Sequence, residues 1–390
     1  MTSQALSTYR WFLPVMATGG LTMSLTAPLE VLYAHDFSSS SAYLGLFMLG
    51  AALGVIAVDV LGTRFIPGLD ARSALVVSLV VFGLSCIGMG LAQDGVVLMV
   101  SRIMQGIGGG GVLGAGLQAA VRVVPPSVDV ARSLGRFNVA FIIGGALGAP
   151  GGLLVAALVD SGFGYRLALI GTGVFSIAVA AAVAAALPRL DAPPGVAAPR
   201  IGLPRFARTP ARTTSLVLAM SGEFLRGGVL FTALPLAGAV RGYPVAMITA
   251  AIALMSATEI VALWLAYRLI RRTGTIRMLL VSLSLGALCA TGLALTSATS
   301  AYLMMAAVFG ISLAGATASL PVLIVAQVGD SSAGVAKFRI SAGMGLLVGS
   351  VGCAVLASHI GVPALFAGIA VTLLGCARLA HTVGRRMPAV

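Results

Sequence analysis

The sequence has very little charge. Only 9% of its 390 residues are Asp, Glu, Lys or Arg, whereas a soluble domain carries about 25%. Apolar residues make up 59% of the chain and the mean hydropathy is +1.06. A chain with so few polar side chains cannot face water on all sides, so we expect its solvent to be a lipid bilayer.

Cysteine and histidine are also scarce, which limits the chemistry the chain can perform. The four cysteines lie in separate apolar runs without CxxC spacing, and the three histidines lie near run ends or in the tail. This spacing predicts neither a disulfide framework nor a metal site, and we expect no cofactor. The residues concerned are Cys86, Cys289, Cys353, Cys376, His35, His359 and His381.

Motifs for nucleotide hydrolysis and for covalent catalysis are missing from the sequence as well. It contains no P-loop, so this chain does not itself use ATP directly. It contains no nucleophile elbow and no His/Asp constellation, which argues against a membrane-embedded enzyme. A non-transporting sensor is a further alternative, but no stretch has the composition of a soluble signalling domain.

Long apolar runs, by contrast, are abundant. A run of about 20 apolar residues can cross the hydrocarbon core as a helix that satisfies its own backbone hydrogen bonds. No A-x-A-like cleavage site follows the first run, so we interpret it as a retained span. The sequence therefore predicts an all-α integral membrane protein with twelve transmembrane helices. The runs are 11–33, 42–61, 73–92, 96–121, 137–158, 165–188, 214–236, 245–267, 278–296, 302–326, 338–358 and 362–380.

The basic residues are distributed unequally between the two sides of these runs. The net charge is +13, but it is not gathered into one patch, so we expect no nucleic-acid partner. With the N-terminus inside, 20 of the 24 Lys and Arg flank the cytoplasmic ends of runs, two (Arg166 and Arg241) lie outside, and two lie within runs. This positive-inside bias predicts that both termini are cytoplasmic. The cytoplasmic set is Arg10, Arg64, Arg72, Arg122, Arg132, Arg136, Arg189, Arg200, Arg205, Arg208, Arg212, Arg268, Arg271, Arg272, Arg277, Lys337, Arg339, Arg378, Arg385 and Arg386.

The longest polar segment, 189–213, falls between the sixth and seventh runs and is rich in proline and arginine. It divides the chain into a six-helix bundle over 1–188, a basic cytoplasmic linker over 189–213 and a second six-helix bundle over 214–390. Two such halves are typical of transporters built from repeats, whose site lies at the repeat interface. The alternative is an ordinary long loop in a helical bundle.

The fourth run contains a motif that points to a family. The stretch LMVSRIMQGIGGGG places Leu98, Arg102, Gln105, Gly106 and Gly108 in the pattern L-x-x-x-R-x-x-Q-G-x-G. This pattern and the two-bundle layout resemble the major facilitator superfamily, and within it the twelve-span drug:proton antiporter branch. The resemblance implies two pseudo-symmetric six-helix bundles. It also implies that the arginine belongs to the proton-coupling machinery and that the Gln-Gly-x-Gly segment contributes to gating.

A second resemblance lies between the second and third runs, where the family carries G-x-x-x-D-R-x-G-R-R. Here GVIAVDVLGTR keeps Asp59, Gly62 and Arg64, while Val55 and Val60 replace the first glycine and the first arginine. The resemblance implies that the three retained residues serve as gating elements.

A third resemblance lies in the fifth run, where the family's exporters carry G-x-x-x-G-P-x-x-G-G. The stretch GGALGAPGG matches at Gly145 and Pro150, has Ala149 in place of a glycine, and has the closing glycine pair shifted to Gly151 and Gly152. The motif implies a gating role for Gly145, Pro150 and Gly151. Because it separates exporters from uptake members, it favours export.

Glycine spacing has a physical interpretation that is independent of family. Glycines recur every four residues in the fourth run and in the fifth run, which places a groove of small residues along one helix face. Such a groove allows close helix packing, and Pro150 predicts a kink that could serve as a hinge. The glycines are Gly106, Gly110, Gly114, Gly144, Gly148 and Gly152.

Ionisable residues inside spans are candidate functional residues because they are costly in hydrocarbon. Counting at 1.5 Å per residue places Glu30 and Arg102 at one depth, which favours a buried pair between them. Glu223, Arg226 and Glu259 share another depth, and Glu223 and Arg226 are one helical turn apart. We interpret all five as candidate proton-coupling residues, with Glu30 as the first choice of proton carrier and Glu223 or Glu259 as its alternates. The alternatives are an interfacial glutamate at position 30 and a purely structural ion triad in the second half.

The mechanism these residues suggest is proton-coupled antiport by alternating access, exporting a drug-like or small-metabolite substrate. A proton-coupled importer of a small nutrient is the alternative. Tyr33, Asn138 and Phe231 are candidate substrate-cavity residues, although core packing is the favoured interpretation of the aromatic side chains. The partners we expect are a small molecule, protons and lipid. We expect a monomer in a bacterial plasma membrane.

Overall fold

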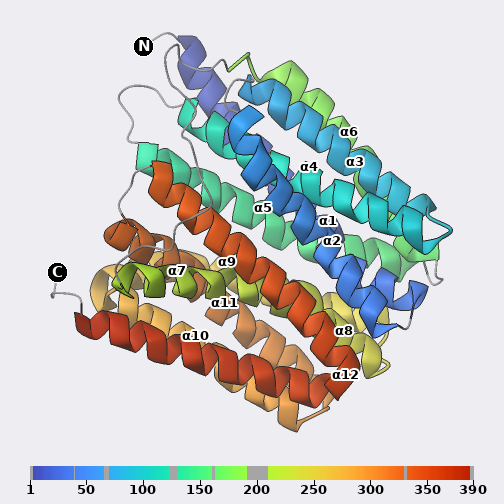
Figure 1. The fold of residues 1–390 in the computed structure, drawn as a ribbon, viewed down its shortest axis with the longest axis vertical. Coiled ribbons are helices and arrows are strands. Elements are labelled where there is room, and N and C mark those ends of the chain that lie inside the picture. Colours follow the sequence, from blue (N-terminus) through green and yellow to red (C-terminus); the bar gives the residue numbers. More distant parts are fainter. Residues whose placement is uncertain are drawn as a thin grey trace. The chain divides into compact units, whose positions relative to one another are not determined.

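The structure, a computed structural model, describes residues 3–38, 40–65, 70–122, 130–159, 163–190, 210–328 and 332–386. Every regular element in this part of the chain is a helix (Figure 1). The first six are α1 (Ser3–Phe37), α2 (Ser41–Phe65), α3 (Ala71–Leu91), α4 (Gly95–Arg122), α5 (Val130–Leu158) and α6 (Phe163–Ala186). The remainder are α7 (Pro210–Glu223), η2 (Phe224–Ala233), α8 (Leu234–Val240), α9 (Val245–Thr273), α10 (Thr275–Leu295), α11 (Thr299–Val328) and α12 (Ser332–Arg386).

The helices confirm the predicted spanning runs. Within the described residues, ten helical stretches are long and apolar enough to cross a membrane, and Ala42–Val58 in α2 is a shorter apolar one. The stretch Ile340–Arg385 contains two predicted runs, because Gly361 breaks α12 between them with a positive φ of 81°. The seventh run is the one that departs from a single α-helix, since it comprises α7, η2 and α8.

The chain divides into two compact units. The first comprises Met1–Leu29 and Leu49–Ile201, and the second comprises Glu30–Met48 and Gly202–Val390. The second unit thus includes the end of α1 and the beginning of α2 in addition to α7–α12. The linker residues 191–209 lie outside the described part of the chain, and the predicted domain boundary at 189–213 stays a prediction.

In the first unit, the groove of small residues in α5 packs directly on the backbone of α1. A Cβ atom added at Gly144 would lie 1.8 Å from a carbonyl oxygen of α1, and one added at Gly152 would lie 1.7 Å from another. Only glycine permits this approach, so the groove predicted from the four-residue spacing is confirmed. The contacts are Gly144 with Ala17, Gly148 with Leu21, and Gly152 with Leu25.

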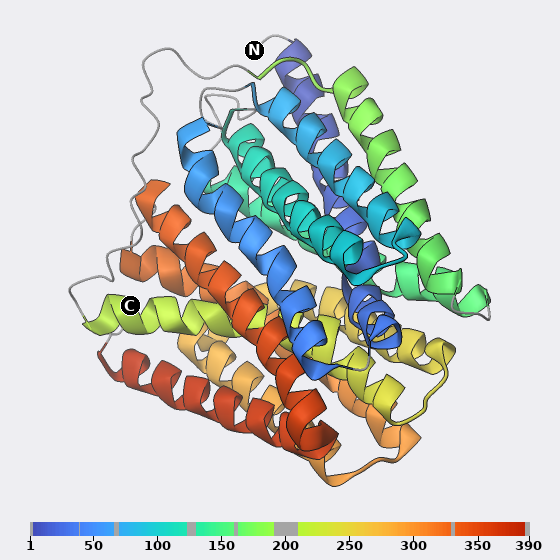
Figure 2. The same ribbon diagram turned by 45° about the vertical axis from the view of Figure 1, so that its right-hand side comes forward.

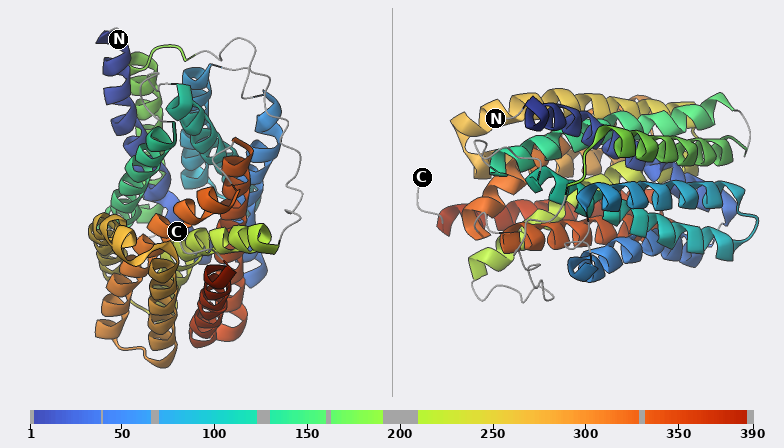
Figure 3. Two further views of the ribbon diagram at one scale, coloured as in Figure 1. Left: turned by 90° about the vertical axis from the view of Figure 1, so that its left-hand side faces the viewer. Right: turned by 90° about the horizontal axis from the view of Figure 1, so that it is seen from above.

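Helices α2 and α4 approach one another in the same way, with a glycine on each side. A Cβ atom at Gly106 would lie 2.0 Å from the Ala51 carbonyl oxygen, and one at Gly54 would lie 2.4 Å from the Ile103 carbonyl oxygen. Beside this pair, α3 packs along both α4 and α6 (Figure 3). The first unit is therefore held together by backbone contact as well as by apolar side chains.

The second unit repeats this packing with different residues. Helix α12 packs along α7 and η2 (Figure 2), where Gly228 faces the Cα atom of Gly349 and Gly345 faces the Met220 carbonyl oxygen. Helix α11 brings Gly310 against the Met255 carbonyl oxygen of α9. These contacts correspond by order of spans to α1 with α5 and to α2 with α4, as expected of two related six-helix halves.

We predict that Gly148→Ala lowers the free energy of unfolding by about 2 kcal/mol, because the new methyl group overpacks the contact between α5 and α1. Gly171→Ala in α6 is the matched control, since a Cβ atom there meets nothing within 4 Å. Unfolding in detergent, followed by circular dichroism, measures both. Equal stability of the two variants would contradict the backbone contact.

An aspartate outside the spans connects the beginning of α3 to the segment that follows α6. Asp70 precedes α3 and accepts hydrogen bonds from the Ser73 hydroxyl at 2.8 Å and from the Leu190 N–H at 2.5 Å. The Arg122 guanidinium donates to the Leu190 carbonyl at 2.7 Å. Burial raises the pKa of Asp70, but the hydrogen bonds from Ser73, Leu190 and Arg72 outweigh it, so that the pKa lies below its usual value.

This lowered pKa predicts a pH-dependent stability. A carboxyl group whose pKa is lower in the folded state stabilises above its unfolded pKa of about 4, and the contribution is lost as pH falls through the folded pKa. We therefore expect Asp70→Asn to be less stable than the wild type at pH 7 and the difference to shrink below pH 4. Thermal unfolding across this pH range measures it, and a constant difference would contradict the role of the charge.

Candidate functional site

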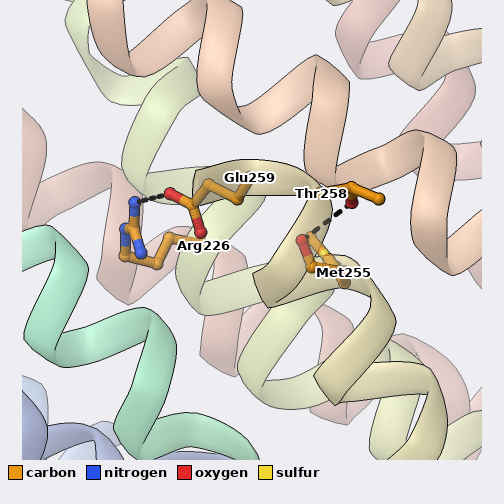
Figure 4. A network of polar contacts seen from close by, with 4 residues as sticks. All are labelled: Arg226, Met255, Thr258 and Glu259. Carbon is orange, nitrogen blue, oxygen red and sulfur yellow. Dashed lines mark hydrogen bonds and ion pairs between the residues drawn. The ribbon is translucent and has the colours of Figure 1, made fainter. Parts of the chain in front are cut away.

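The second unit contains a buried ion pair between two spanning segments. Nη2 of Arg226, on η2, lies 2.5 Å from Oε1 of Glu259, on α9 (Figure 4). The Arg226 side chain is 12% exposed and the Glu259 side chain is fully buried. The second carboxylate oxygen of Glu259, Oε2, has no hydrogen-bond partner among the described residues.

Glu223 adds a third charge to this pair. It is the last residue of α7, one turn before Arg226, and it interacts electrostatically with both Arg226 and Glu259. The structure thus brings together the three residues that the sequence placed at one depth. Two carboxylates and one guanidinium carry a net charge of −1 when both acids are ionised. We refer to these residues as the acidic triad.

The segment that carries Arg226 has an unusual backbone. Residues 224–233 form a π-helix of ten residues, whereas π-helices are rare and mostly single-turn features at functional sites. The Thr232 hydroxyl donates to the Gly227 carbonyl at 2.8 Å, five residues earlier. The sequence predicted an ordinary helix here, and its only signal was the Gly227–Gly228 pair, which packs against α12.

Helix α11 packs against the backbone of α9 at Glu259 and holds this residue in position. The hydroxyl of the preceding residue, Thr258, lies 2.6 Å from the Ala307 carbonyl oxygen of α11. It also lies 3.0 Å from the Met255 carbonyl oxygen (Figure 4). Gly310 lets α11 approach so closely that a Cβ atom there would lie 3.0 Å from the Glu259 backbone nitrogen. The carboxylate therefore projects from a backbone that has little freedom to move.

The first unit contains a separate polar cluster around the motif of the fourth run. The Arg102 side chain is buried and its guanidinium donates to Oε1 of Gln105. Nε2 of Gln105 lies 3.1 Å from the Thr26 hydroxyl oxygen on α1 and 3.6 Å from Sγ of Cys86 on α3. Gln105 therefore links the arginine to two neighbouring helices. Sequence reasoning found Arg102 and Gln105 but missed Thr26 and Cys86.

The remaining glycines proposed as gating residues lie at close helix contacts. A Cβ atom at Gly108 would lie 2.5 Å from the Phe82 backbone nitrogen, and Gly145 and Gly151 face side chains of α1. Helix α5 continues through Pro150, so its role as a hinge stays a prediction. Asp59, Gly62 and Arg64 lie near the end of α2, where the structure does not describe the side chains.

The other candidates fall in different places. Glu30 is buried and belongs to the second unit, whereas Arg102 belongs to the first, so their pairing stays a prediction. Tyr33 is buried, with its ring centroid 6.2 Å from that of Phe37, which is the geometry of aromatic packing. Asn138 and Phe231 are half-buried, and their place in a substrate cavity also stays a prediction.

Apolar spanning helices with charges buried among them define a multi-pass membrane protein. The sequence pattern of the Major Facilitator Superfamily matches residues 12–338, and the chain belongs to this family. It is a secondary transporter of a small molecule rather than an enzyme.

Solved structures of transporters share this fold. One is a bacterial homologue of the human lysosomal transporter Spinster in an inward-facing and occupied conformation, which is 15% identical with a TM-score of 0.75. That match covers 97% of this chain and 96% of the other. The human organic anion transporter MFSD10 (TETRAN) is 15% identical with a TM-score of 0.69, covering 96% and 99%. At this identity the likeness concerns the fold alone.

The ion pair predicts an asymmetric response to mutation. Arg226→Gln removes the cation and leaves the buried Glu259 carboxylate and the half-buried Glu223 carboxylate without it, so we expect a loss of about 3 kcal/mol of unfolding free energy. Adding Glu259→Gln to that variant recovers part of the loss, because it removes one of those uncompensated charges. Denaturation in mixed micelles measures the cycle.

Arg268→Gln is the control for this cycle. It removes an exposed arginine of α9 that stacks 3.6 Å above the Trp264 ring, and we expect a loss below about 1 kcal/mol. A double variant no more stable than Arg226→Gln alone would contradict the pairing.

Proposed function

We propose that the chain is a proton-coupled antiporter that exports a drug-like or small-metabolite substrate by alternating access. The observation that supports this proposal is the acidic triad, in which one arginine pairs with one carboxylate and interacts electrostatically with a second inside spanning segments. One guanidinium can neutralise one carboxylate. The second carboxylate is therefore a place where a proton can bind and leave.

The charge count sets what a proton would do. With both acids ionised, the triad carries −1 in a region where an uncompensated charge is costly. Binding of one proton makes it neutral, with Arg226 paired to whichever acid remains ionised. Binding or release of the proton thus changes the net charge of the triad between 0 and −1. A cationic or polar substrate could bind near the triad when the proton has left.

The triad also lies where a change in pairing can be transmitted to the helices. Arg226 belongs to η2, which packs on α12 through Gly227 and Gly228. A change of partner from Glu259 to Glu223 moves the guanidinium between α9 and α7. Such a movement acts on a segment whose hydrogen bonding already departs from the α-helix. We expect Arg102 to serve proton coupling from the first unit, and Gln105 to serve gating there.

Export is favoured by the fifth-run motif around Gly145 and Pro150, which resembles that of the family's exporters. Positive-inside bias supports cytoplasmic termini. Membership of the drug:proton antiporter branch, a monomeric state and a bacterial plasma membrane belong to the same proposal.

The test is proton movement in proteoliposomes that contain a pH-sensitive dye. A proton gradient is imposed, and cationic, neutral and anionic compounds are added one at a time. We expect at least one compound to drive protons opposite to its own movement. Glu259→Gln and Glu223→Gln should reduce this proton movement to that of protein-free liposomes. Asp94→Asn, which changes an exposed carboxylate that caps α4, is the matched control and should leave it intact.

Two outcomes would overturn the proposal. Movement of protons and compound in the same direction would make the chain an importer. Coupling that survives neutralisation of Glu30, Glu223 and Glu259 together would remove these carboxylates from the mechanism.

A further inference from the structure

An open cavity of about 360 Å³ lies at one end of the second unit, and no residue of the acidic triad lines it. It is formed where α8 ends, where α10 ends, and where α12 resumes after Gly361. The residues that line it are Val240, Arg241, Ala294, Leu295, Thr296, Ser297, Val362 and Pro363. Arg241 is the only charged residue among them.

Arg241 is held in place by the turn that carries it. Its backbone N–H donates to the Ala237 carbonyl at 3.1 Å, and the Tyr243 N–H donates to the Gly238 carbonyl at 2.9 Å. The turn passes through Gly242, whose φ of 71° is accessible to glycine at little cost. The arginine is therefore positioned by the backbone before any ligand arrives.

Only one of the two terminal nitrogens of the Arg241 guanidinium forms a hydrogen bond among the described residues. Nη2 of Arg241 donates to the Leu293 carbonyl of α10 at 2.8 Å. Nη1 is buried and has no hydrogen-bond partner among the residues that the structure describes. A buried guanidinium nitrogen without an acceptor is costly, so a ligand that supplies an acceptor would be stabilised beside Arg241.

The surrounding polar groups also favour a ligand that accepts hydrogen bonds. Two carbonyl oxygens at this end of α10 already accept hydrogen bonds. The Leu293 carbonyl accepts from Arg241, and the Ser297 carbonyl accepts from the Tyr243 hydroxyl at 2.5 Å. The Thr296 hydroxyl oxygen accepts from the Ala298 N–H at 3.2 Å, which leaves the hydroxyl proton to donate. A cation and a hydroxyl donor around one cavity suit an oxyanion.

The rim of the cavity is apolar and exposed. Leu295 is 83% exposed and Val240 is 55% exposed, and both are last residues of spanning helices. Such side chains at helix ends in a membrane protein contact the acyl chains next to the headgroups. An acceptor for Arg241 that arrives with acyl chains is a phospholipid.

We propose that this cavity binds the phosphate group of an anionic phospholipid, with Arg241 as its cation and Leu295 and Val240 against the acyl chains. The site is independent of the acidic triad. It would fix the α10–α12 end of the second unit to the surface of the membrane.

The test uses the full chain in phosphatidylcholine nanodiscs with a trace of photoactivatable phosphatidylglycerol. Labelling is measured by mass spectrometry on the peptides that contain 240–243 and 294–297. We expect Arg241→Gln to reduce labelling by about tenfold, the change given by one charge-assisted hydrogen bond. Arg166→Gln is the matched control, because Arg166 also donates to a helix-terminal carbonyl, that of Ala92 at 3.1 Å. It should leave labelling unchanged.

A second variant covers the case in which Arg241→Gln does not fold. Val362→Trp fills the cavity without changing Arg241 and should also abolish labelling. Equal labelling by a photoactivatable phosphatidylcholine, or labelling unaffected by both variants, would overturn the proposal. Displacement of the lipid by inorganic phosphate would make a soluble anion the occupant and would equally overturn it.

Discussion

A charged side chain inside a spanning helix has to find its partner within the protein, because hydrocarbon offers none. The described part of the chain meets this constraint in two ways. Arg226 pairs with the fully buried Glu259. Arg102 donates a hydrogen bond to Gln105, whose amide nitrogen in turn donates to side chains of α1 and α3. The first solution is an ion pair that a proton can disturb. The second is a neutral network that orients a charge.

Both solutions require helices that approach closely, and glycine provides that approach. Gly310 brings α11 onto the backbone at Glu259, and Gly228 brings η2 onto Gly349 of α12. In the first unit, Gly106 brings the helix that carries Arg102 and Gln105 against the backbone of α2. The buried charges and the glycine contacts therefore belong to one arrangement. The close glycine contacts fix the separation between neighbouring helices, and this separation determines which partner each buried charged side chain can reach. The π-helical segment departs from this regularity, and it carries Arg226.

Much of this arrangement could be predicted from the sequence. Apolar runs located the helices, and the four-residue spacing of Gly144, Gly148 and Gly152 predicted the groove that α1 occupies. Depth counting grouped Glu223, Arg226 and Glu259, because helix geometry converts residue number to height. What it could not give was rotation about each helix axis. The π-helix, and the partners Thr26 and Cys86 of Gln105, depend on that rotation and on tertiary packing, for which no local pattern exists.

The central claim is that the acidic triad exchanges a proton, and infrared difference spectroscopy of the purified protein tests it without a substrate. As the pH is lowered, the account predicts one new carboxylic-acid C=O band that Glu259→Gln or Glu223→Gln abolishes or shifts. The opposing acid stays ionised against Arg226, so one band is expected from the triad rather than two. A protonation band unchanged in both variants would show that the triad is a fixed ion cluster and would contradict the account.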